Sequence, residues 1–152
     1  MSLATFHLSG YLFGVEVATV QEVVRHQPMT RVPLAPPALS GLINLRGQII
    51  PAVDLRRRLG FPDRPADELP MVVVVRAGDG MVGVLVDRIG DVVEVSEETF
   101  EEPPDTLAGV ARELIRGAYK LRGALLLSLD VHGAVELRPG DRDSGTPVPA
   151  SM

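Results

Sequence analysis

The stretch GLINLRGQIIPAVDLRRRLG, residues 41–60, decides the fold of this chain. Mostly apolar side chains run from Leu42 to Val53, and the run is broken in the middle by Arg46 and Gly47. This pattern predicts a hairpin corner that feeds a buried strand, with Gly47 supplying a positive φ angle at the corner. The guanidinium at that corner is expected to pair with a carboxylate.

The same pattern occurs a second time near the C-terminus. The segments RGQIIPAVDL and RGALLLSLDV begin at Arg46 and Arg122, which are 76 positions apart (122 − 46). Each contains Arg-Gly, six mainly apolar residues, an Asp and another apolar residue. We therefore expect two similar β modules, in which Asp54 and Asp130 cap short helices rather than act as catalytic carboxylates. The first helix is predicted at Asp54–Leu59.

The composition favours a mainly β protein whose core is built from Val, Leu and Ile. Of the 152 residues, 45% are hydrophobic and 23% are charged, but only 4% are aromatic. Branched aliphatic side chains favour strands, and the 13 Pro and 15 Gly indicate short elements. The length fits one domain, or two small halves that share a core.

The charge and the chain ends exclude several classes of protein. A net charge of −5 argues against binding to nucleic acid or to an anionic membrane, because both require a concentrated basic face. The absence of Cys fits a reducing compartment. The N-terminus lacks the basic region of a signal peptide, and no apolar run approaches the ~20 residues of a membrane span. We expect a cytoplasmic protein.

Apolar residues that alternate with a period of two predict strands along most of the chain. Three valines at helical spacing predict a short helix within residues 18–25, and residues 96–104 are expected to form a capped helical turn and a loop. Residues 78–80 are a strong hairpin turn signal. The strands are expected at residues 5–9, 11–17, 71–77, 81–87, 91–96, 113–121 and 124–129.

These elements predict one folded domain followed by a tail. Residues 1–137 are expected to form a single domain made of two small β-barrel halves with short strands. Residues 138–152 are polar and rich in Pro and Gly, so we expect them to be disordered.

Taken together, these motifs closely resemble the CheW family of bacterial chemotaxis coupling proteins. The resemblance extends over roughly Thr5 to Leu137 and includes an early segment with Gln21-Glu22. Its other features are a Pro-rich connector, Gly41, Asn44-Leu45-Arg46-Gly47, Pro51, Val53-Asp54-Leu55, Gly83, Val86-Asp87 and Asp91-Val92.

The resemblance implies a CheW-like fold of two intertwined, SH3-like, five-stranded β-barrels with a few short helices. It implies an adaptor without enzymatic activity or cofactor, which bridges the cytoplasmic tip of a methyl-accepting receptor and the regulatory domain of the histidine kinase CheA. The protein would then be recruited to receptor arrays at the inner membrane. The receptor's helical hairpin is expected in an apolar groove where the two halves meet.

The resemblance also assigns expected roles to individual residues. Core packing is the alternative for each valine among them, because most valines are buried. The receptor groove is expected to include Val17, Val20, Glu22, Arg46, Val84, Val86 and Ile89, and the kinase-binding edge Gly41, Ile49 and Val72. Gly47, Asp54 and Asp130 are expected to be structural.

Two interpretations of Arg46 remain open at this point. In the first, Arg46 pairs with Glu22 and is partly offered to a partner. In the second, the same pair is a structural clamp that holds the predicted Glu22 helix on the barrel.

An enzymatic function is disfavoured by the other polar residues. His7, His26 and His132 have no metal-ligand spacing, so no metal site is predicted. The basic run at residues 56–58 is expected to be a solvated face, with a weak electrostatic handle for an acidic partner as the alternative. Asp87 is expected to lie in a loop, where solvation or turn hydrogen bonds explain it. No nucleophile elbow or phosphate-binding loop is present.

Two alternative functions and two departures from the family pattern also follow. The chain could couple a kinase that controls gliding or gene expression, or, less favoured, it could be a β-barrel module for a small ligand. The scarcity of aromatic residues disfavours the second.

The loop with Glu101-Glu102 is unusually acidic, and residues 138–152 replace an expected terminal helix. A kinase that contacts this loop should carry compensating positive charge.

Overall fold

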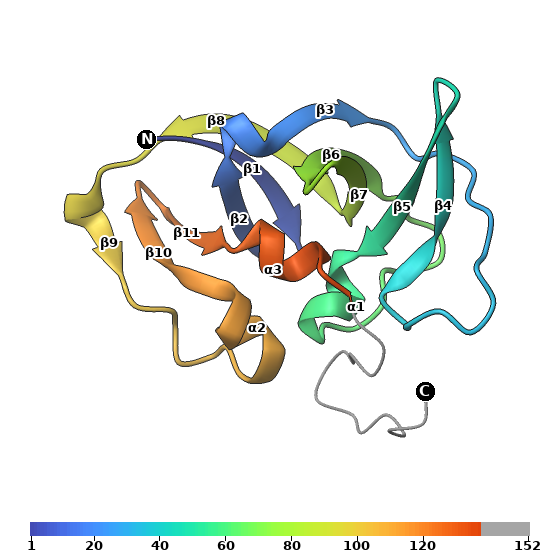
Figure 1. Cartoon of the computed structure of the whole chain (residues 1–152). Coiled ribbons are helices and arrows are strands. Elements are labelled where there is room, and N and C mark those ends of the chain that lie inside the picture. The colour runs from blue at the N-terminus through green and yellow to red at the C-terminus, as the bar shows by residue number, and fades with distance from the viewer. Residues whose placement is uncertain (138–152) are drawn as a thin grey trace.

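The computed structural model describes residues 1–137, and it shows a mainly β protein with two sheets and a few short helices (Figure 1). The prediction of a mainly β fold is therefore confirmed, while the expected disordered tail lies outside the described residues. The helices are α1 (Leu55–Leu59), α2 (Gly109–Leu114) and α3 (Val131–Val135), with 3-10 turns η1 (Val17–Thr19) and η2 (Glu97–Thr99). Within residues 1–137, no helix has the length and apolarity required to cross a membrane.

The first sheet has the strand order β8-β1-β2-β11-β10-β9. It has six strands rather than the expected five, because the two-residue strand β9 adds to the edge of β10. Its strands are β1 (Ser2–Leu8), β2 (Tyr11–Glu16), β8 (Arg88–Glu94), β9 (Phe100–Glu101), β10 (Ile115–Leu121) and β11 (Ala124–Leu129).

The second sheet has the strand order β3-β6-β7-β5-β4, and it has the expected five strands. Its strands are β3 (Val20–Val24), β4 (Leu39–Leu45), β5 (Gln48–Asp54), β6 (Met71–Ala77) and β7 (Gly80–Val86).

The two sheets repeat one topology, as the sequence echo predicts. In each sheet two antiparallel hairpins are joined through one parallel pair, which is β2 with β11 in the first and β7 with β5 in the second. The backbone N–H of Asp54 donates to Ala38 at 2.7 Å, and that of Asp130 donates to Leu114 at 2.8 Å. Both acceptors lie 16 residues before their donor (54 − 38 and 130 − 114), so the two halves match in detail.

The halves also exchange one strand each. Strand β3 follows β2 in the chain but pairs with β6 of the second sheet, and β8 follows β7 but pairs with β1 of the first. The halves are therefore intertwined, and neither sheet is formed by one continuous segment.

Three clusters of buried side chains hold the molecule together. The largest contains residues of both sheets and of all three α-helices, for example Phe13, Val84 and Leu55. Two smaller clusters belong to one half each and occupy equivalent places, with Leu126 in the first half and Ile50 in the second. Because the largest cluster is shared, the two sheets cannot separate without exposing it to water.

Two short helices behave as the sequence predicts. The Asp54 carboxylate accepts a hydrogen bond from the N–H of Arg56 at 3.0 Å, and Gly60 ends α1 with a φ of 81°. The Asp130 carboxylate accepts from the N–H of Gly133 at 3.1 Å. Both aspartates are therefore N-caps.

Three predictions of local structure are wrong. The helix predicted in residues 18–25 is η1 followed by β3, because Val20, Val23 and Val24 pair with valines of β6. The strand predicted from residue 113 begins at Ile115, after the unpredicted α2. The turn expected between residues 87 and 91 is instead the start of β8, which is already paired with β1 there.

Candidate interaction surfaces

The Arg46-Gly47 corner is a two-residue turn between the hydrogen-bonded strands β4 and β5. Leu45 pairs with Gln48, and Arg46 and Gly47 have φ angles of 54° and 86°. The Asn44 side-chain oxygen accepts the N–H of Gly47 at 2.9 Å. Glycine or asparagine is the usual choice for a position like that of Arg46, so the arginine there indicates a role for its side chain.

That side chain forms the expected pair with Glu22. Nη1 of Arg46 donates to both carboxylate oxygens of Glu22, at 2.8 and 2.7 Å. The Glu22 side chain is only 23% exposed, whereas that of Arg46 is 73% exposed. Within residues 1–137 the Arg46 side chain has no other hydrogen bond, so most of its donors face solvent.

The edge strand β3, which carries Glu22, has exposed apolar side chains next to this pair. The edge strand β8, its counterpart in the first sheet, has exposed apolar side chains at the equivalent place. Val20 lies opposite Val75, and Ile89 lies opposite Phe6, which are matching positions of the two sheets. Large side chains on or beside these edges are partly exposed: Val17 (38%), Val23 (42%), Ile89 (37%) and Val92 (63%). Sequence reasoning missed Val23 and Val92. The signal that could have found them is the run of β-branched residues on an edge strand.

Three residues expected at these surfaces lie in the core instead. Val84 and Val86 are 2% and 0% exposed and belong to the shared cluster, and Val72 is 1% exposed within the second half. Their expected contact with a receptor or a kinase is corrected to core packing, because Val84 and Val86 fill the seam between the halves and Val72 packs inside the second half.

The other two residues of the expected kinase edge lie on β4 and β5. Ile49 is 57% exposed close to the Arg46 corner. Gly41 is buried, and a Cβ atom there would lie 2.6 Å from the backbone oxygen of Thr30. Gly41 therefore allows the preceding connector to lie close against β4, and Ile49 provides the accessible apolar surface.

A buried ion-pair cluster joins the two halves at the start of β8. The Asp87 carboxylate accepts hydrogen bonds from Arg56 at 2.9 and 2.6 Å, from Arg64 at 3.0 Å and from the N–H of Ser9 at 2.8 Å. The side chains of Arg56, Arg64 and Asp87 are 11%, 8% and 12% exposed. Asp87 is therefore not in a solvated loop, as the sequence suggests, but links α1 to the first sheet.

The pKa values of Asp87 and of the neighbouring Asp54 are shifted in opposite directions. Burial raises the pKa of Asp87, but hydrogen bonds from Arg56 and Ser9 and the charges of Arg56 and Arg64 outweigh it, so the pKa lies below its ordinary value. For Asp54 burial prevails and raises the pKa, although Arg64 and the first N–H groups of α1 oppose it. Of these two carboxyl groups, Asp87 is therefore the one that its surroundings stabilise as an anion.

The other arginines of α1 also serve the fold. Arg57 donates to the Asp63 carboxylate at 3.0 and 3.2 Å, and Arg58 donates to the backbone oxygens of Ala134 and Gly133 at 2.9 and 3.1 Å. The expectation of a solvated basic face is wrong for Arg56 and Arg58, whose side chains bond Asp87 and α3, whereas the Arg57 side chain is 43% exposed.

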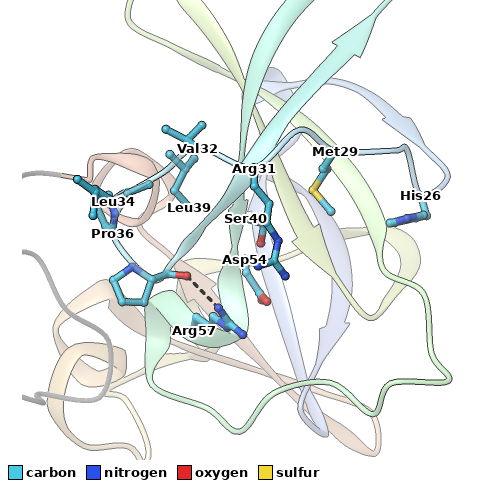
Figure 2. Close-up of a pocket in the computed structure, with 12 residues that line it drawn as sticks. His26, Met29, Arg31, Val32, Leu34, Pro36, Leu39, Ser40, Asp54 and Arg57 are labelled. Carbon is cyan, nitrogen blue, oxygen red and sulfur yellow. Dashed lines mark hydrogen bonds between the residues drawn. The ribbon is translucent and has the colours of Figure 1, made fainter.

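The chain between β3 and β4 covers a cavity of about 590 Å³ at the end of the second sheet. Figure 2 shows Leu34 and Pro36 on one side of it and His26 with Met29 on the other. Nη1 of Arg57 donates to the backbone oxygen of Pro37 at 3.3 Å along its lower side. Within residues 1–137, no group of three or more His, Asp or Glu side chains could hold a metal ion.

Comparisons with known proteins agree with this geometry. The family model of the CheW-like domain matches residues 2–138. Chemotaxis protein CheW of Treponema pallidum is 34% identical over 134 residues, which cover 86% of this chain and 79% of that protein. Chemotaxis protein CheW of Bacillus subtilis is 29% identical over 134 residues, which cover 88% and 86%.

A solved structure gives the same result for the fold. The crystal structure of the scaffolding protein TtCheW from Thermoanaerobacter tengcongensis superposes with a TM-score of 0.79 and 27% identity, covering 92% of this chain and 95% of that one. Sequence and structure thus agree over nearly all of the described residues, and the chain belongs to the CheW family, as a non-catalytic scaffold protein of chemotaxis signalling.

Proposed function

We propose that this protein joins the cytoplasmic tip of a methyl-accepting receptor to the regulatory domain of a CheA-type histidine kinase. In this role it resides in the cytoplasm and is recruited to receptor arrays at the inner membrane. The observation that carries the proposal is the Arg46–Glu22 pair, in which a left-handed backbone presents a mostly exposed guanidinium beside an apolar edge strand.

The receptor surface of this proposal consists of the edges of β3 and β8. Val17, Val20 and Ile89 offer apolar contact area for a helical hairpin, and exposed Val23 and Val92 extend it. Arg46 supplies the charged contact, because its unused donors can reach a carboxylate of the partner. Val84 and Val86 support these strands from inside.

The kinase surface of this proposal lies at the β4–β5 end of the second sheet. Ile49 is the exposed apolar residue there, and Gly41 keeps the connector in place behind it. The regulatory domain of the kinase resembles the CheW fold, so the expected contact joins the end of one barrel to the end of another. Modest affinities at both surfaces would add up in a multivalent array.

The test is the charge reversal Arg46→Glu, with Arg122→Glu as the matched control at the equivalent corner. Placing a carboxylate beside Glu22 removes the pair and repels an acidic partner. We expect receptor binding to fall by about tenfold or more, equivalent to about 1.4 kcal/mol. Kinase binding and the melting temperature should change little, because the Arg46 side chain is 73% exposed.

Binding is measured with receptor cytoplasmic fragments and with the isolated kinase regulatory domain, alongside thermal melting. Unchanged receptor binding by a folded Arg46→Glu protein would contradict the proposed receptor surface. A large fall in melting temperature would instead support the clamp interpretation of the pair.

A further inference from the structure

The connector between β3 and β4, residues 25–38, forms one side of the cavity of about 590 Å³. This volume lies within the range of small-ligand sites. Arg31 comes from the connector, Ser40 from β4 and Asp54 from the end of β5, and all three line the cavity (Figure 2). They lie at the end of the β4–β5 hairpin that is opposite to the Arg46 corner. Three elements therefore bring polar groups together away from that corner.

The guanidinium of Arg31 is available to a ligand. The residue is exposed, and within residues 1–137 its side chain forms neither a hydrogen bond nor an ion pair. Arg57 on the same wall adds a second positive charge, although it is already bonded to the Pro37 oxygen and to Asp63. Guanidinium groups bind oxoanions through their N–H donors. The cavity therefore favours an anion.

Two more polar groups of the cavity wall make no hydrogen bond within the part of the chain that the structure describes. One is the buried Nδ1 atom of His26, and the other is the hydroxyl of Ser40. Buried polar atoms are nearly always hydrogen-bonded, so an unpartnered one in a cavity wall indicates a position for a ligand atom. The Ser40 hydroxyl is a donor that an oxoanion accepts.

Asp54 determines which anion fits, because a carboxylate in the wall repels an anion that carries no proton. Asp54 is 9% exposed, and burial raises its pKa. Its carboxylate accepts the N–H of Arg56, and its remaining lone pairs can accept a further donor. A protonated phosphate group provides such a donor in its P–OH, whereas sulfate has none. The wall therefore distinguishes two anions of similar size and shape.

We propose that this cavity is a binding site for a hydrogen phosphate group, carried by inorganic phosphate or by a small phosphate monoester. Arg31 and Ser40 donate to the phosphate oxygens, and the P–OH donates to the Asp54 carboxylate. A bound phosphate thereby ties the connector to the β4–β5 hairpin. The neighbouring part of the wall is apolar and suits the organic part of a monoester, since it consists of Val32, Leu34, Pro36 and Leu39.

The first experiment is a calorimetric titration of the full chain with inorganic phosphate, phenyl phosphate and sulfate at constant ionic strength. A pH of about 6 is suitable, because it is close to the second pKa of a phosphate monoester and much of the ester keeps its proton. We expect both phosphates to bind, and sulfate to bind about tenfold or more weakly, because it lacks the charge-assisted bond to Asp54. Sulfate binding as tight as that of phosphate, or no binding of either phosphate, would overturn the proposal.

The two phosphate probes also distinguish the two sources of the group. Tighter binding of phenyl phosphate than of inorganic phosphate would support a monoester, whose organic part contacts the apolar wall. Equal or weaker binding of phenyl phosphate would support inorganic phosphate itself.

The second experiment compares two single substitutions in the connector. Arg31→Gln removes the guanidinium in the cavity wall, whereas the matched control Arg25→Gln removes one that does not line the cavity. Both residues are exposed, so both proteins should fold. Phosphate binding should weaken about tenfold or more in Arg31→Gln and stay unchanged in the control. Equal losses in the two variants would overturn the proposal, because they would indicate general attraction to a basic segment.

The substitution Asp54→Asn tests the role of the proton. Asparagine is as good an N-cap as aspartate, so α1 should keep its cap while the cavity wall loses its negative charge. Sulfate should then bind about as tightly as phosphate, which is a gain that a purely structural role of Asp54 would not produce. A folded Asp54→Asn protein that still discriminates against sulfate as strongly as the natural protein would overturn the proposal. Thermal melting of the same samples shows that the variant is folded.

Discussion

The carboxylate of Asp87 contacts three segments that are far apart in the sequence. It accepts hydrogen bonds from Ser9 in the first sheet, from Arg56 at the start of α1 and from Arg64 in the loop that follows. In a site of low exposure, such a pair stabilises the fold only while all partners are present. Asp87 is therefore the residue that links the two halves of the molecule electrostatically.

We predict that Asp87→Asn destabilises the protein by about 3–5 kcal/mol, because it leaves two buried arginines without their counter-ion. Chemical denaturation of the two proteins at neutral pH measures the difference. The matched control is Asp91→Asn, since the Asp91 side chain is exposed and forms no ion pair within residues 1–137. Equal losses in both variants would contradict the role of Asp87.

The same variant should change how stability depends on pH. The pKa of Asp87 is lowered by folding, so its contribution is present above its ordinary value of about 4 and is lost as the pH falls through the folded value. The stability difference between the natural protein and Asp87→Asn should therefore shrink in acid. The raised pKa of Asp54 acts in the opposite direction, but it is common to both proteins and cancels in the comparison.

At the residue scale the sequence predicts local chemistry well and distant partners poorly. The caps at Asp54 and Asp130 follow from short-range patterns, and both are present. The Arg46–Glu22 pair was expected from the family resemblance. The Asp87 cluster was missed, because nothing in the spacing of Ser9, Arg56 and Asp87 shows that they meet.

At the scale of elements, β3 shows how pairing overrides local spacing. Its valines fit one face of a helix, yet they form an edge strand against the four consecutive valines of β6. The sequence of an edge strand predicts its secondary structure poorly, because the strand pairs with a neighbouring strand on one side only. Apart from the start of β10, the hairpins β6–β7 and β10–β11 were predicted more accurately, since turn residues separate their strands and runs of Val or Leu mark the strands themselves.

The close contact of the connector with β4 leads to a prediction for Gly41. A Cβ at Gly41 would lie 2.6 Å from the Thr30 oxygen, and this oxygen accepts the N–H of Leu42 at 2.8 Å. Gly41→Ala should push the connector away and cost about 1–3 kcal/mol. Hydrogen exchange should show faster exchange at the N–H groups of Thr30 and Leu42.

The matched control for this prediction is Gly80→Ala. Gly80 also lies in a strand of the second sheet, but a Cβ there meets nothing within 4 Å, and its φ is not in the left-handed region. Its substitution should leave exchange at Thr30 unchanged. Equal exchange in the two variants would show that the connector does not depend on Gly41.

At the scale of the whole molecule, the exchanged strands and the shared cluster make the two halves one cooperative unit. Ile50 and Leu126 are each 2% exposed or less and occupy equivalent places in the separate clusters of the two halves. Ile50→Ala and Leu126→Ala should each cost about 2–5 kcal/mol. Calorimetry should show a single transition that shifts downward as a whole in both variants.

A calorimetric trace with two transitions, of which each variant shifts only one, would contradict this cooperativity.

The sequence predicts the class of fold and the repeat, because both follow from periodic patterns. Such patterns do not predict the exchange of β3 and β8. The sequence of either strand is equally compatible with pairing in the half that precedes it.

The exchange of strands also has a consequence for synthesis on the ribosome. The hairpin β1–β2 needs β8 on one side and β11 on the other, and β11 begins at Ala124, 108 residues after the end of β2 at Glu16 (124 − 16). At ~5–20 residues per second, the nascent hairpin waits on the order of 5–20 s with Phe6, Leu8 and Phe13 uncovered. Early translation is therefore the stage at which this chain most needs a chaperone.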